Sequence, residues 1–459
     1  MPDACDLAVI GSGPGGCAAA LTAARRGLRV RLVEREQWGG VCLNVGCIPT
    51  KALLTVSRFV QRLRQAKALG VSIHGYDVDY AAVMARNQRI IGALRRGLTD
   101  LLRHERVEVM PGAAAFETPH RLIIDQEGAS QALEARRIII ASGGRPASGP
   151  WTLDEERIVS YRGLLALSQL PKSLLIIGGG VIGCEFASCF SAFGTEVTIL
   201  EQQPQMLPME DRDAVRWLTR RFASDGIAVR TGTTVRDLRV SSSGVLATLS
   251  DDTQLTAERC LVAIGLRPNS ESLRLAAASL STREGGVAVD AQLRTAQPHI
   301  AAIGDCVPGH GLAHWASGEG TLAVRNLLGD PPESLNPDEI PRCVFTDPEL
   351  AHIGPLESQM QAPVRASRLF FGALGKSHCD EETEGFVKLL VDPATDHVRG
   401  ATIIGAHASS LIHHAVLAIR HGLTAKQLAR TMTAHPTLPE SITEAAAHLY
   451  GESLLRFAS

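Results

Sequence analysis

Two cysteines, Cys42 and Cys47, stand five positions apart in the stretch from Gly39 to Lys51. An undistorted helix rises about 7.5 Å over five residues, whereas the Cα atoms of a disulfide lie about 4.4–6.8 Å apart. Bonding these cysteines therefore requires a bend between them, which Gly46 allows. A nearby cation such as Lys51 lowers a thiol pKa and favours the reactive thiolate. The stretch predicts a catalytic dithiol, although the spacing alone would favour two unrelated buried thiols.

A glycine-rich turn precedes the cysteines and lies between a predicted strand and a predicted helix. Residues 7–10 form the strand, Gly11, Gly13 and Gly16 follow it, and a second strand at 29–34 ends at Glu34. In such a unit the glycines let a pyrophosphate approach the helix N-terminus, and the acid accepts a hydrogen bond from a ribose hydroxyl. The unit predicts a dinucleotide site.

The same unit recurs later in the chain, with a strand at 173–177 and a second strand at 196–201. Gly178, Gly180 and Gly183 stand 23, 21 and 18 residues before Glu201, the same three offsets that separate the first glycines from Glu34. This repetition favours two dinucleotide sites over two structural glycine turns. The first cysteine stands eight residues after Glu34, so the first nucleotide lies close to the redox pair. Cysteines exchange electrons with a pyridine nucleotide most simply through a flavin, so we assign FAD to the first site and the nicotinamide cofactor to the second.

The acid of the second unit also indicates which nicotinamide cofactor is used. A carboxylate at Glu201 binds the 2′-hydroxyl of NAD and repels the 2′-phosphate of NADP. The next residues, Gln202 and Gln203, provide no arginine for that phosphate. We expect a preference for NAD.

The segments between and after the two units predict how they connect. A long helical region is expected at 49–104, followed by strands at 107–116 and 121–125. Strands at 136–141 and 259–265 each run into a glycine turn, so the second nucleotide-binding domain is predicted to be inserted into the first. A further strand at 299–303 ends near Asp305, whose carboxylate could bind a ribityl or ribose hydroxyl.

A different pattern follows the linker at 336–341 and predicts an α+β domain. Strands are expected at 342–345, 386–391 and 401–405, and helices at 409–421, 425–430 and 440–450. This domain contains His435 and, five residues later, Glu440. Histidine changes charge near neutral pH, and a carboxylate partner orients it and stabilises its cation. The domain's other histidines are interpreted as structural or surface residues: His407, His413, His414 and His421.

Composition limits the function classes. The 46 basic and 48 acidic residues give a net charge of −2, which argues against a nucleic-acid partner. The ten cysteines are scattered, the N-terminus has no basic region of a signal peptide, and no run of 18 apolar residues is present. We expect a cytoplasmic protein without a membrane span, and we predict no metal site.

Two stretches are specific enough to indicate a family: residues 40–54, which contain both cysteines, and residues 435–440. They resemble the pyridine nucleotide–disulfide oxidoreductases with a CxxxxC redox centre, and the resemblance covers essentially the full length. Supporting segments are 141–143, 295–305, 312–314 and 344–349. The members that oxidise dihydrolipoyl groups are the most similar.

The resemblance implies an α/β fold with two Rossmann-like domains and a C-terminal α+β dimerisation domain. The FAD-binding domain would comprise residues 1–145 and a central part at 269–336. The NAD-binding domain would be inserted at 146–268, and the interface domain of a homodimer would follow at 337–459.

The resemblance also implies roles for individual residues. Cys42 would exchange with the substrate, Cys47 would lie against the flavin, and Lys51 and Glu185 would form an ion pair on its nicotinamide side. The partner subunit's His435, oriented by its Glu440, would deprotonate the incoming thiol. Further cofactor contacts are implied at Ala114, Ser142, Asp305 and Ala313 for FAD, and at Val235 and Gly265 for NAD.

The implied activity is oxidation of protein-bound dihydrolipoyl groups with reduction of NAD, in partnership with a 2-oxo acid dehydrogenase or glycine cleavage complex. Several positions depart from the family on the substrate side: Trp315, Ser317, Gly318, Leu374, Lys376 and Thr433. They leave open an NADH-dependent reductase of another disulfide, of a specialised lipoyl carrier or of a quinone. A partner-binding subunit with a structural flavin is a further alternative, against which the intact dithiol and His435 argue.

Overall fold

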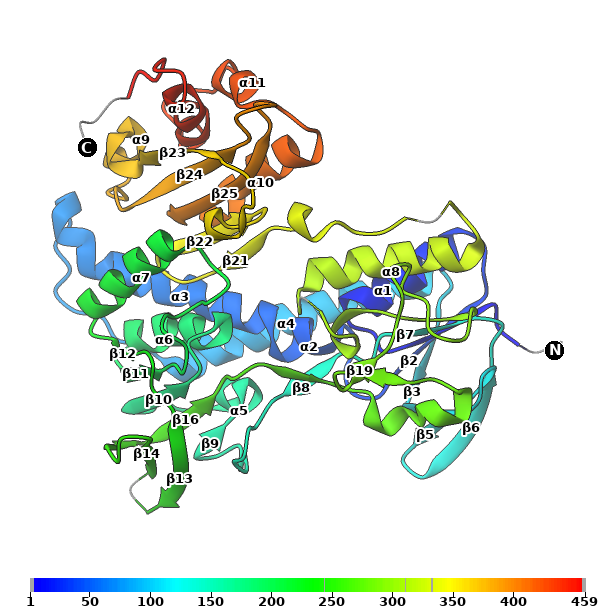
Figure 1. Ribbon diagram of the computed structural model, residues 1–459. Coiled ribbons are helices and arrows are strands. Elements are labelled where there is room, and N and C mark those ends of the chain that lie inside the picture. The colour runs from blue at the N-terminus through cyan, green and yellow to red at the C-terminus, as the bar shows by residue number, and fades with distance from the viewer. Residues whose placement is uncertain (1–3, 243, 310, 332, 456–459) are drawn as a thin grey trace.

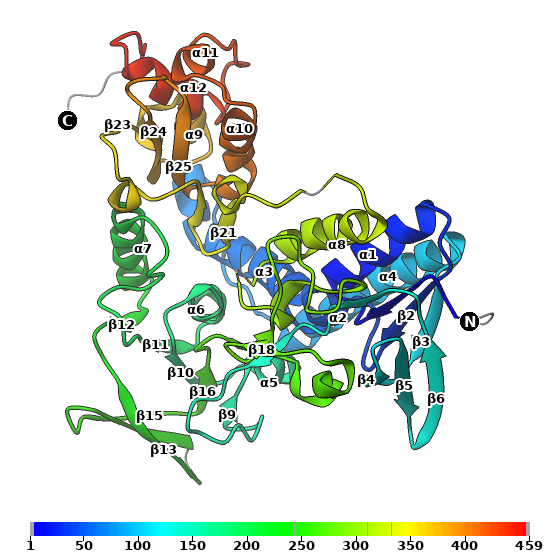
Figure 2. The same ribbon diagram turned by 45° about the vertical axis from the view of Figure 1, so that its right-hand side comes forward.

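Three five-stranded sheets organise the part of the chain that the structure describes, and two of them are parallel (Figure 1). The computed structural model describes residues 4–242, 244–309, 311–331 and 333–455. The C-terminal antiparallel sheet lies above the two parallel sheets in both views (Figures 1 and 2).

The first parallel sheet has the order β20-β7-β1-β2-β3. Its central strands are short runs of buried apolar residues, as expected for a sheet covered by helices on both faces. Helix α1 (Pro14–Arg25) packs closely on α8 (Ala313–Leu328). Only a glycine at position 320 allows this approach, because a Cβ there would lie 2.3 Å from the Gly15 oxygen. The strands are β1 (Leu7–Ile10), β2 (Val30–Glu34), β3 (Glu108–Pro111), β7 (Ile138–Ile140) and β20 (Ile300–Ala302).

The second parallel sheet repeats this arrangement with the order β12-β11-β10-β16-β9. The strand–turn–helix–strand units predicted at both glycine turns are confirmed. The strands are β9 (Ile158–Val159), β10 (Ser173–Ile177), β11 (Glu196–Leu200), β12 (Ala228–Arg230) and β16 (Arg259–Val262), and the helices are α5 (Tyr161–Ala166), α6 (Val181–Ala192) and α7 (Arg212–Ser224).

The second sheet forms between two visits of the chain to the first sheet. The chain leaves the first sheet after β7 and returns to it at β20, which confirms the predicted insertion. The outgoing strand β8 (Gly144–Pro146) pairs antiparallel with the returning strand β17 (Leu266–Pro268). Both connections between the two sheets therefore run side by side.

Small antiparallel sheets accompany the parallel ones. The sequence predicted parts of the small sheet at residues 113–134. It predicted none of the small sheet at residues 235–257, whose strands lie in a stretch without long apolar runs. They are formed by β4 (Ala113–Thr118), β5 (Arg121–Gln126) and β6 (Ala129–Glu134), by β13 (Val235–Ser241), β14 (Gly244–Leu249) and β15 (Gln254–Ala257), and by β18 (Thr282–Arg283) and β19 (Gly286–Val287).

The C-terminal part is the predicted α+β arrangement, with the sheet order β21-β22-β25-β24-β23. The strands β22 and β23 were not predicted. The elements are β21 (Arg342–Val344), β22 (Glu349–Ile353), β23 (Arg365–Phe370), β24 (Gly385–Val391), β25 (Val398–Gly405), α9 (Gly375–Cys379), α10 (Ala408–Arg420), α11 (Ala425–Ala429) and α12 (Glu440–His448). Short 3-10 helices are η2 (Glu271–Leu273), η3 (Leu275–Ala278), η4 (Gly304–Cys306), η5 (Pro337–Glu339), η6 (Glu357–Gln359) and η7 (Phe371–Ala373).

The prediction of one helical region over 49–104 was wrong in its middle. Helix α3 (Cys47–Gln65) passes into η1 (Ala66–Leu69), an extended segment follows, and α4 (Tyr80–His104) begins after it. Gly70 takes a left-handed conformation at φ 79°, which ends the helix. Asp79 then caps α4 by accepting a hydrogen bond from the Ala82 N–H.

One stretch of the described chain, residues 40–69, is long and apolar enough to cross a membrane by length and composition alone. It includes α3, which packs against α6 and α4. The α3 residues Leu53 and Leu54 belong to the hydrophobic core. The absence of a membrane span stays a prediction.

Two stacked histidines join the β4–β5 turn to the residue before β20. The rings of His120 and His299 lie 3.9 Å apart and nearly parallel. His299 also bonds the Pro119 carbonyl, and His120 bonds that of Ala135. Burial lowers the pKa of His299, the hydrogen bond with the Pro119 carbonyl opposes this shift, and the charge of His120 adds to it.

This stack predicts an acid-dependent loss of stability. Because the folded-state pKa of His299 is lowered, the unfolded chain binds more protons as pH falls through about 6.5, and the stabilising contribution is lost there. The melting temperature should fall between pH 7.5 and pH 5.5. In His299→Phe, which stacks but does not titrate, that fall should be smaller. An equal fall in both proteins would contradict this origin.

Candidate active site

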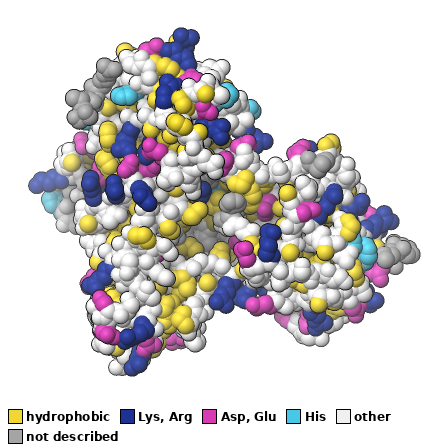
Figure 3. Space-filling view, in the orientation of Figure 1, with side chains coloured by type: hydrophobic (Ala, Val, Ile, Leu, Met, Phe, Trp, Pro, Cys, Tyr) yellow, Lys and Arg dark blue, Asp and Glu magenta, His cyan; other side chains and the backbone are white. Residues whose placement is uncertain are grey.

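A single large cavity contains both glycine turns and both cysteines. Its volume is about 1760 Å³, which exceeds the 300–1,000 Å³ typical of a site for one small ligand. The front surface is hollowed between the parts of the molecule, with hydrophobic side chains at the rim (Figure 3). The cavity therefore has room for two dinucleotides.

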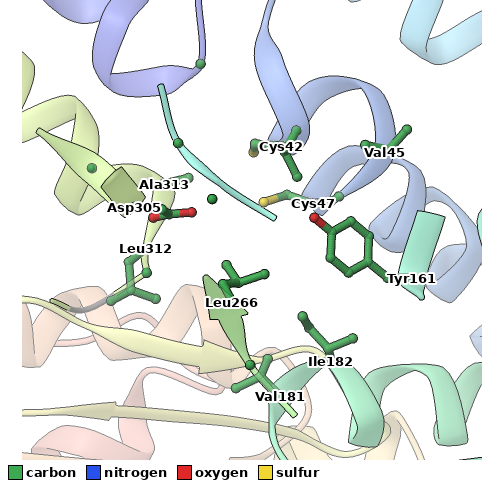
Figure 4. A pocket seen from close by; sticks show the side chains of 18 of the residues that line it. Cys42, Val45, Cys47, Tyr161, Val181, Ile182, Leu266, Asp305, Leu312 and Ala313 are labelled. Carbon is green, nitrogen blue, oxygen red and sulfur yellow. The ribbon is translucent and has the colours of Figure 1, made fainter. Parts of the chain in front are cut away.

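The dithiol lies at a break between two helices. Cys42 belongs to α2 (Gly40–Val45), and Cys47 is the first residue of α3. The predicted bend is confirmed at Gly46, which separates the helices and where a Cβ would lie 3.0 Å from the Val41 oxygen. Both cysteines are unpaired and line the cavity, and the break places their side chains near each other there (Figure 4).

The two thiols differ in acidity. The hydrogen bond from Cys42, reinforced by the Lys51 charge, lowers the pKa of Cys47 to about 7, while burial and the Glu185 charge oppose that shift. The same hydrogen bond raises the pKa of Cys42, and burial adds to the rise. Cys47 is therefore the more acidic thiol, and the thiolate forms there.

A buried ion pair holds the cation next to this thiolate. Lys51 Nζ lies 2.7 Å and 2.9 Å from the two carboxylate oxygens of Glu185, whose side chain is only 4% exposed. The Phe345 N–H donates a 3.0 Å hydrogen bond to the same carboxylate, and the Phe345 ring centre lies 4.6 Å from Lys51 Nζ. The pair joins the dithiol helix α3 to α6 of the second unit.

The first glycine turn has the shape of a phosphate cradle. Gly11 has φ 100°, and a Cβ there would lie 2.3 Å from the Ala141 oxygen. A Cβ on Gly13 would meet no protein atom within 4 Å, so the turn is open toward the cavity. The first turn of α1 carries no acidic residue, and its N–H groups are suited to a pyrophosphate.

The second turn repeats these features at the start of α6. Gly178 has φ 108° with a Cβ position 2.4 Å from the Ala263 oxygen, and Gly180 is open. Gly183 does not line the cavity; a Cβ there would lie 2.0 Å from the Gly178 oxygen, so it serves helix–strand packing. These residues fit a second dinucleotide.

The acids at the ends of β2 and β11 bind their own turns. Glu34 accepts hydrogen bonds from the Ser12 N–H at 2.8 Å and the Ser12 hydroxyl at 2.7 Å. Glu201 accepts from the N–H groups of Gly179 at 2.6 Å and Gln203 at 2.7 Å. Each carboxylate has about four lone-pair sites, so both retain acceptor capacity toward the cavity that they line.

The remaining cofactor residues predicted from the resemblance also line the cavity. Burial raises the pKa of Asp305, whose carboxylate points into the open space (Figure 4). The cavity-lining residues of this group are Ala114, Ser142, Asp305, Ala313, Val235 and Gly265.

The predicted acid–base pair is formed, but it does not line this cavity. His435 Nδ1 lies 2.9 Å from Glu440, which also accepts a 2.5 Å hydrogen bond from the Thr437 N–H. The His435 side chain is 78% exposed and lies five residues before α12, whose first residue is Glu440. Helix α12 belongs to the C-terminal part (Figure 2). The dyad is preassembled on the surface, away from the dithiol of its own chain.

Other residues of the site were missed or misjudged from the sequence. Tyr161 directs its buried hydroxyl into the cavity (Figure 4), and Phe345 contributes a backbone N–H, which leaves no side-chain signal. His413, interpreted as a structural or surface histidine, lines the cavity. Among the substrate-side departures, the Trp315 indole bonds Glu319 and does not line it.

Three further departures lie outside the cavity of their own chain. Leu374 is 1% exposed in the core of the C-terminal part. Lys376 forms an ion pair with Asp380 one turn later in the same region. Thr433 is half-buried and lies two positions before His435 of the dyad.

Comparisons with known proteins agree with this geometry. Residues 5–320 match the family model described as pyridine nucleotide-disulphide oxidoreductase, and residues 340–446 match that of its dimerisation domain. The chain is 39% identical over 450 residues to a dihydrolipoyl dehydrogenase of Chlorobaculum tepidum, covering 96% of each chain. It is 37% identical over 453 residues to that of Chlamydia muridarum, covering 97% of each.

Solved structures show the same fold. LpdA from Mycobacterium tuberculosis superposes with a TM-score of 0.92 at 30% identity, covering 97% of this chain and 99% of that chain. The HOCl-induced flavoprotein disulfide reductase RclA from Escherichia coli gives 0.86 at 28% identity, covering 96% and 99%. The chain therefore belongs to the pyridine nucleotide-disulphide oxidoreductase family and is an NAD-dependent flavoprotein oxidoreductase.

Proposed function

We propose that this enzyme oxidises protein-bound dihydrolipoyl groups to lipoyl groups and reduces NAD. The observation that carries the proposal is the dithiol in one cavity with both glycine turns, its thiolate next to the Lys51–Glu185 pair. Relatives that are 37–39% identical over nearly their whole length are dihydrolipoyl dehydrogenases. A lipoyl-bearing carrier of a 2-oxo acid dehydrogenase or glycine cleavage complex is the proposed partner.

The acidity difference assigns the two sulfurs different roles in the proposed exchange. With the pair oxidised, a substrate thiolate attacks Cys42, and the S–S bond breaks to release Cys47 as a thiolate, the form its environment favours. The second substrate sulfur, once deprotonated, then displaces Cys42, which takes up a proton. The substrate loses two electrons and becomes the cyclic disulfide, and the enzyme holds the dithiol.

FAD, held by the first turn, supplies the two-electron relay between this dithiol and the nicotinamide of NAD at the second turn. In the proposed assignment, Glu34 and Asp305 bind hydroxyls of FAD, and Glu201 binds the adenosine ribose of NAD. The residues proposed to hold FAD are Gly11, Gly13, Gly16, Glu34, Lys51, Ala114, Ser142, Asp305 and Ala313, and those proposed to hold NAD are Gly178, Gly180, Glu185, Glu201, Val235 and Gly265. Gly183 supports the NAD site indirectly, through the close packing of α6 on the turn.

The proposed proton acceptor comes from a second copy of the chain. The dyad of His435 and Glu440 is exposed and absent from its own cavity, while the C-terminal part matches a dimerisation domain. We therefore assign a homodimer in which each dithiol faces the partner subunit's His435. The division into residues 1–145, 146–268, 269–336 and 337–459, and a cytoplasmic location, belong to the same proposal.

The second candidate is an NADH-dependent reductase of another disulfide, a specialised lipoyl carrier or a quinone. The substrate-side departures favour retaining this second candidate, since Thr433 lies two positions before His435. Steady-state assays with dihydrolipoamide, lipoyl domains and quinones decide between the candidates.

Glu201 predicts a preference for NADH over NADPH. In Glu201→Ala the preference should narrow by about 1–3 kcal/mol, the size of a hydrogen bond to a charged group. The measurement is the ratio of kcat/KM for the two nucleotides, with Glu196→Ala at the far end of β11 as the control. A wild-type ratio near one would refute the assignment.

The two cysteines predict different variant spectra. Reduced wild-type protein should develop a long-wavelength thiolate–flavin absorbance as pH rises through about 7, the pKa of Cys47. Cys42→Ser should keep this band and lose disulfide turnover, whereas Cys47→Ser should lose both. The exposed Cys379→Ser is the matched control. Normal lipoamide turnover by Cys42→Ser would show that the redox pair is wrongly assigned.

His435 predicts loss of the thiol chemistry alone. His435→Gln should lower dihydrolipoamide turnover by about 10²–10⁴-fold, the usual cost of removing a general acid–base. Flavin reduction by NADH should stay nearly intact, since hydride transfer needs no thiol base.

Mixing His435→Gln subunits with Cys42→Ser subunits should restore part of the activity, because each hybrid dimer contains one intact site. Hybrid formation is verified by mass. No recovery in verified hybrids would refute the shared site, and unchanged turnover by His435→Gln alone would favour the quinone alternative.

A further inference from the structure

A buried carboxylate lies behind the wall of the cavity. Glu319 on α8 is 5% exposed and does not itself line the cavity. One of its oxygens accepts a 2.6 Å hydrogen bond from the Gly304 N–H, and the other accepts a 2.6 Å bond from the Trp315 indole N–H. Gly304 begins the turn η4, whose next residue, Asp305, points into the cavity (Figure 4). Glu319 therefore contacts, from behind, the turn that presents Asp305.

The two N–H donors favour the ionised form of Glu319. A carboxylate accepts at both oxygens, whereas a protonated carboxyl must donate from one of them. Burial raises the pKa of Glu319, the hydrogen bonds from Gly304 and Trp315 oppose that rise, and the Asp305 charge adds to it. Protonation of Glu319 would therefore cost one of its two hydrogen bonds.

The direction of the turn depends on contacts beyond the sheet. The last hydrogen bond of the strand region joins the Ile303 N–H to the Ile140 carbonyl at 2.9 Å. Gly304 then takes φ 66°, and the chain leaves the sheet there. A Cβ on Gly304 would lie 3.3 Å from the Ala316 Cβ, so the turn lies close against α8. Glu319 is thus the α8 side chain that binds the turn at its first residue.

The other titratable groups near Glu319 are neutral or already bonded. From η4, Asp305 faces Glu319 together with the Cys306 thiol, whose pKa burial raises to about 11. Strand β20 contributes only apolar residues. The remaining groups on α1 and α8 have these partners: Cys17 with the Ser12 carbonyl, Arg25 with Glu105, Arg26 with Asp330, His314 with the Pro341 carbonyl, and Arg325 with Asp330 and Glu333. Asp305 is therefore the charged neighbour that matters for Glu319.

We propose that Trp315 and Glu319 are positioning residues that hold the Gly304–Asp305 turn in the shape that binds FAD. The indole N–H fixes one carboxylate oxygen, so that the other is directed at the Gly304 N–H. Trp315 is one of the departures from the family pattern, and this contact assigns it to the flavin side of the site. The inference rests on the proposed placement of FAD beside Asp305, and it is independent of the disulfide substrate.

The test measures the rate at which the FAD-loaded enzyme releases FAD, followed by the rise of flavin fluorescence after dilution. In Glu319→Gln the amide has a single acceptor oxygen, and its NH2 group faces the second donor. One buried N–H is then left without a partner, and the release rate should rise about 10-fold.

A double variant tests whether the two residues act together. Trp315→Phe alone should raise the release rate about 3–10-fold through the lost hydrogen bond. Added to Glu319→Gln, it removes the donor that the amide NH2 opposes and lets the amide oxygen accept from Gly304. The double variant should therefore release FAD no faster than Glu319→Gln alone, whereas independent effects would multiply.

The pH dependence gives a second signature. As pH falls, Glu319 takes up a proton and loses one hydrogen bond, so release from the wild-type enzyme should accelerate. Because burial raises the pKa of Glu319, this begins at a higher pH than for an exposed glutamate. Glu319→Gln lacks this titration, while Asp305 titrates in both proteins. The ratio of variant to wild-type release rates should therefore shrink from about pH 8 to about pH 5.

Matched controls separate positioning from general damage. Glu349 is a buried glutamate that accepts a 2.9 Å hydrogen bond from the Ser409 N–H and does not line the cavity. Glu349→Gln should leave FAD release unchanged, as should Trp217→Phe on α7. Melting temperatures are recorded for every variant, and Trp315→Phe, which retains the carboxylate, carries the test if Glu319→Gln folds poorly.

Three outcomes would overturn the proposal. Unchanged FAD release in Glu319→Gln and Trp315→Phe, while Asp305→Ala accelerates it, would refute the positioning role and leave the proposed function intact. Unchanged release in Asp305→Ala as well would remove the placement of FAD on which the inference rests. An equal acceleration in Glu349→Gln would show that loss of any buried carboxylate has the same effect.

Discussion

The contact on which the rest of this structure depends is the buried ion pair between Lys51 and Glu185. Lys51 belongs to the helix that begins with Cys47, and Glu185 belongs to the helix that follows the second glycine turn. One contact therefore serves both halves of the cavity. It orients the cation that lowers the pKa of the Cys47 thiol, and it fixes the dithiol helix relative to the second nucleotide-binding unit. A lone buried charge of either sign would be costly, so neither residue can be replaced without its partner.

The parts of this fold that could be predicted from the sequence are those with local causes. Strand, glycine turn, helix and acid follow one another within about two dozen residues, and the requirement for each glycine is local, as the close approach of Gly11 to the Ala141 oxygen illustrates. The bend at Gly46 was predictable for the same reason. The helix break after Leu69 also has a local cause in Gly70, but the apolar pattern on both sides suggested continuity.

The parts that could not be predicted depend on contacts between distant segments. The Phe345 N–H bonds Glu185 across 160 residues, and a backbone donor has no residue type to recognise. Arg342 meets Glu210 across 132 residues, and neither belongs to a motif. Tyr161 enters the cavity because its helix α5 lies next to β16 and β9, a tertiary relation. The role of the His435–Glu440 pair, and its action from the partner subunit, were expected from the family resemblance and not from spacing alone.

The antiparallel pairing of β8 with β17 has a consequence for the history of the chain. The two ends of the second sheet's segment leave and re-enter the first sheet beside each other, with Leu266 opposite Pro146. A segment whose ends are adjacent can be acquired or exchanged as a unit, since its host needs no long spacer and no strand has to be threaded. The repeated glycine offsets then indicate a duplicated unit that was inserted where β8 and β17 pair.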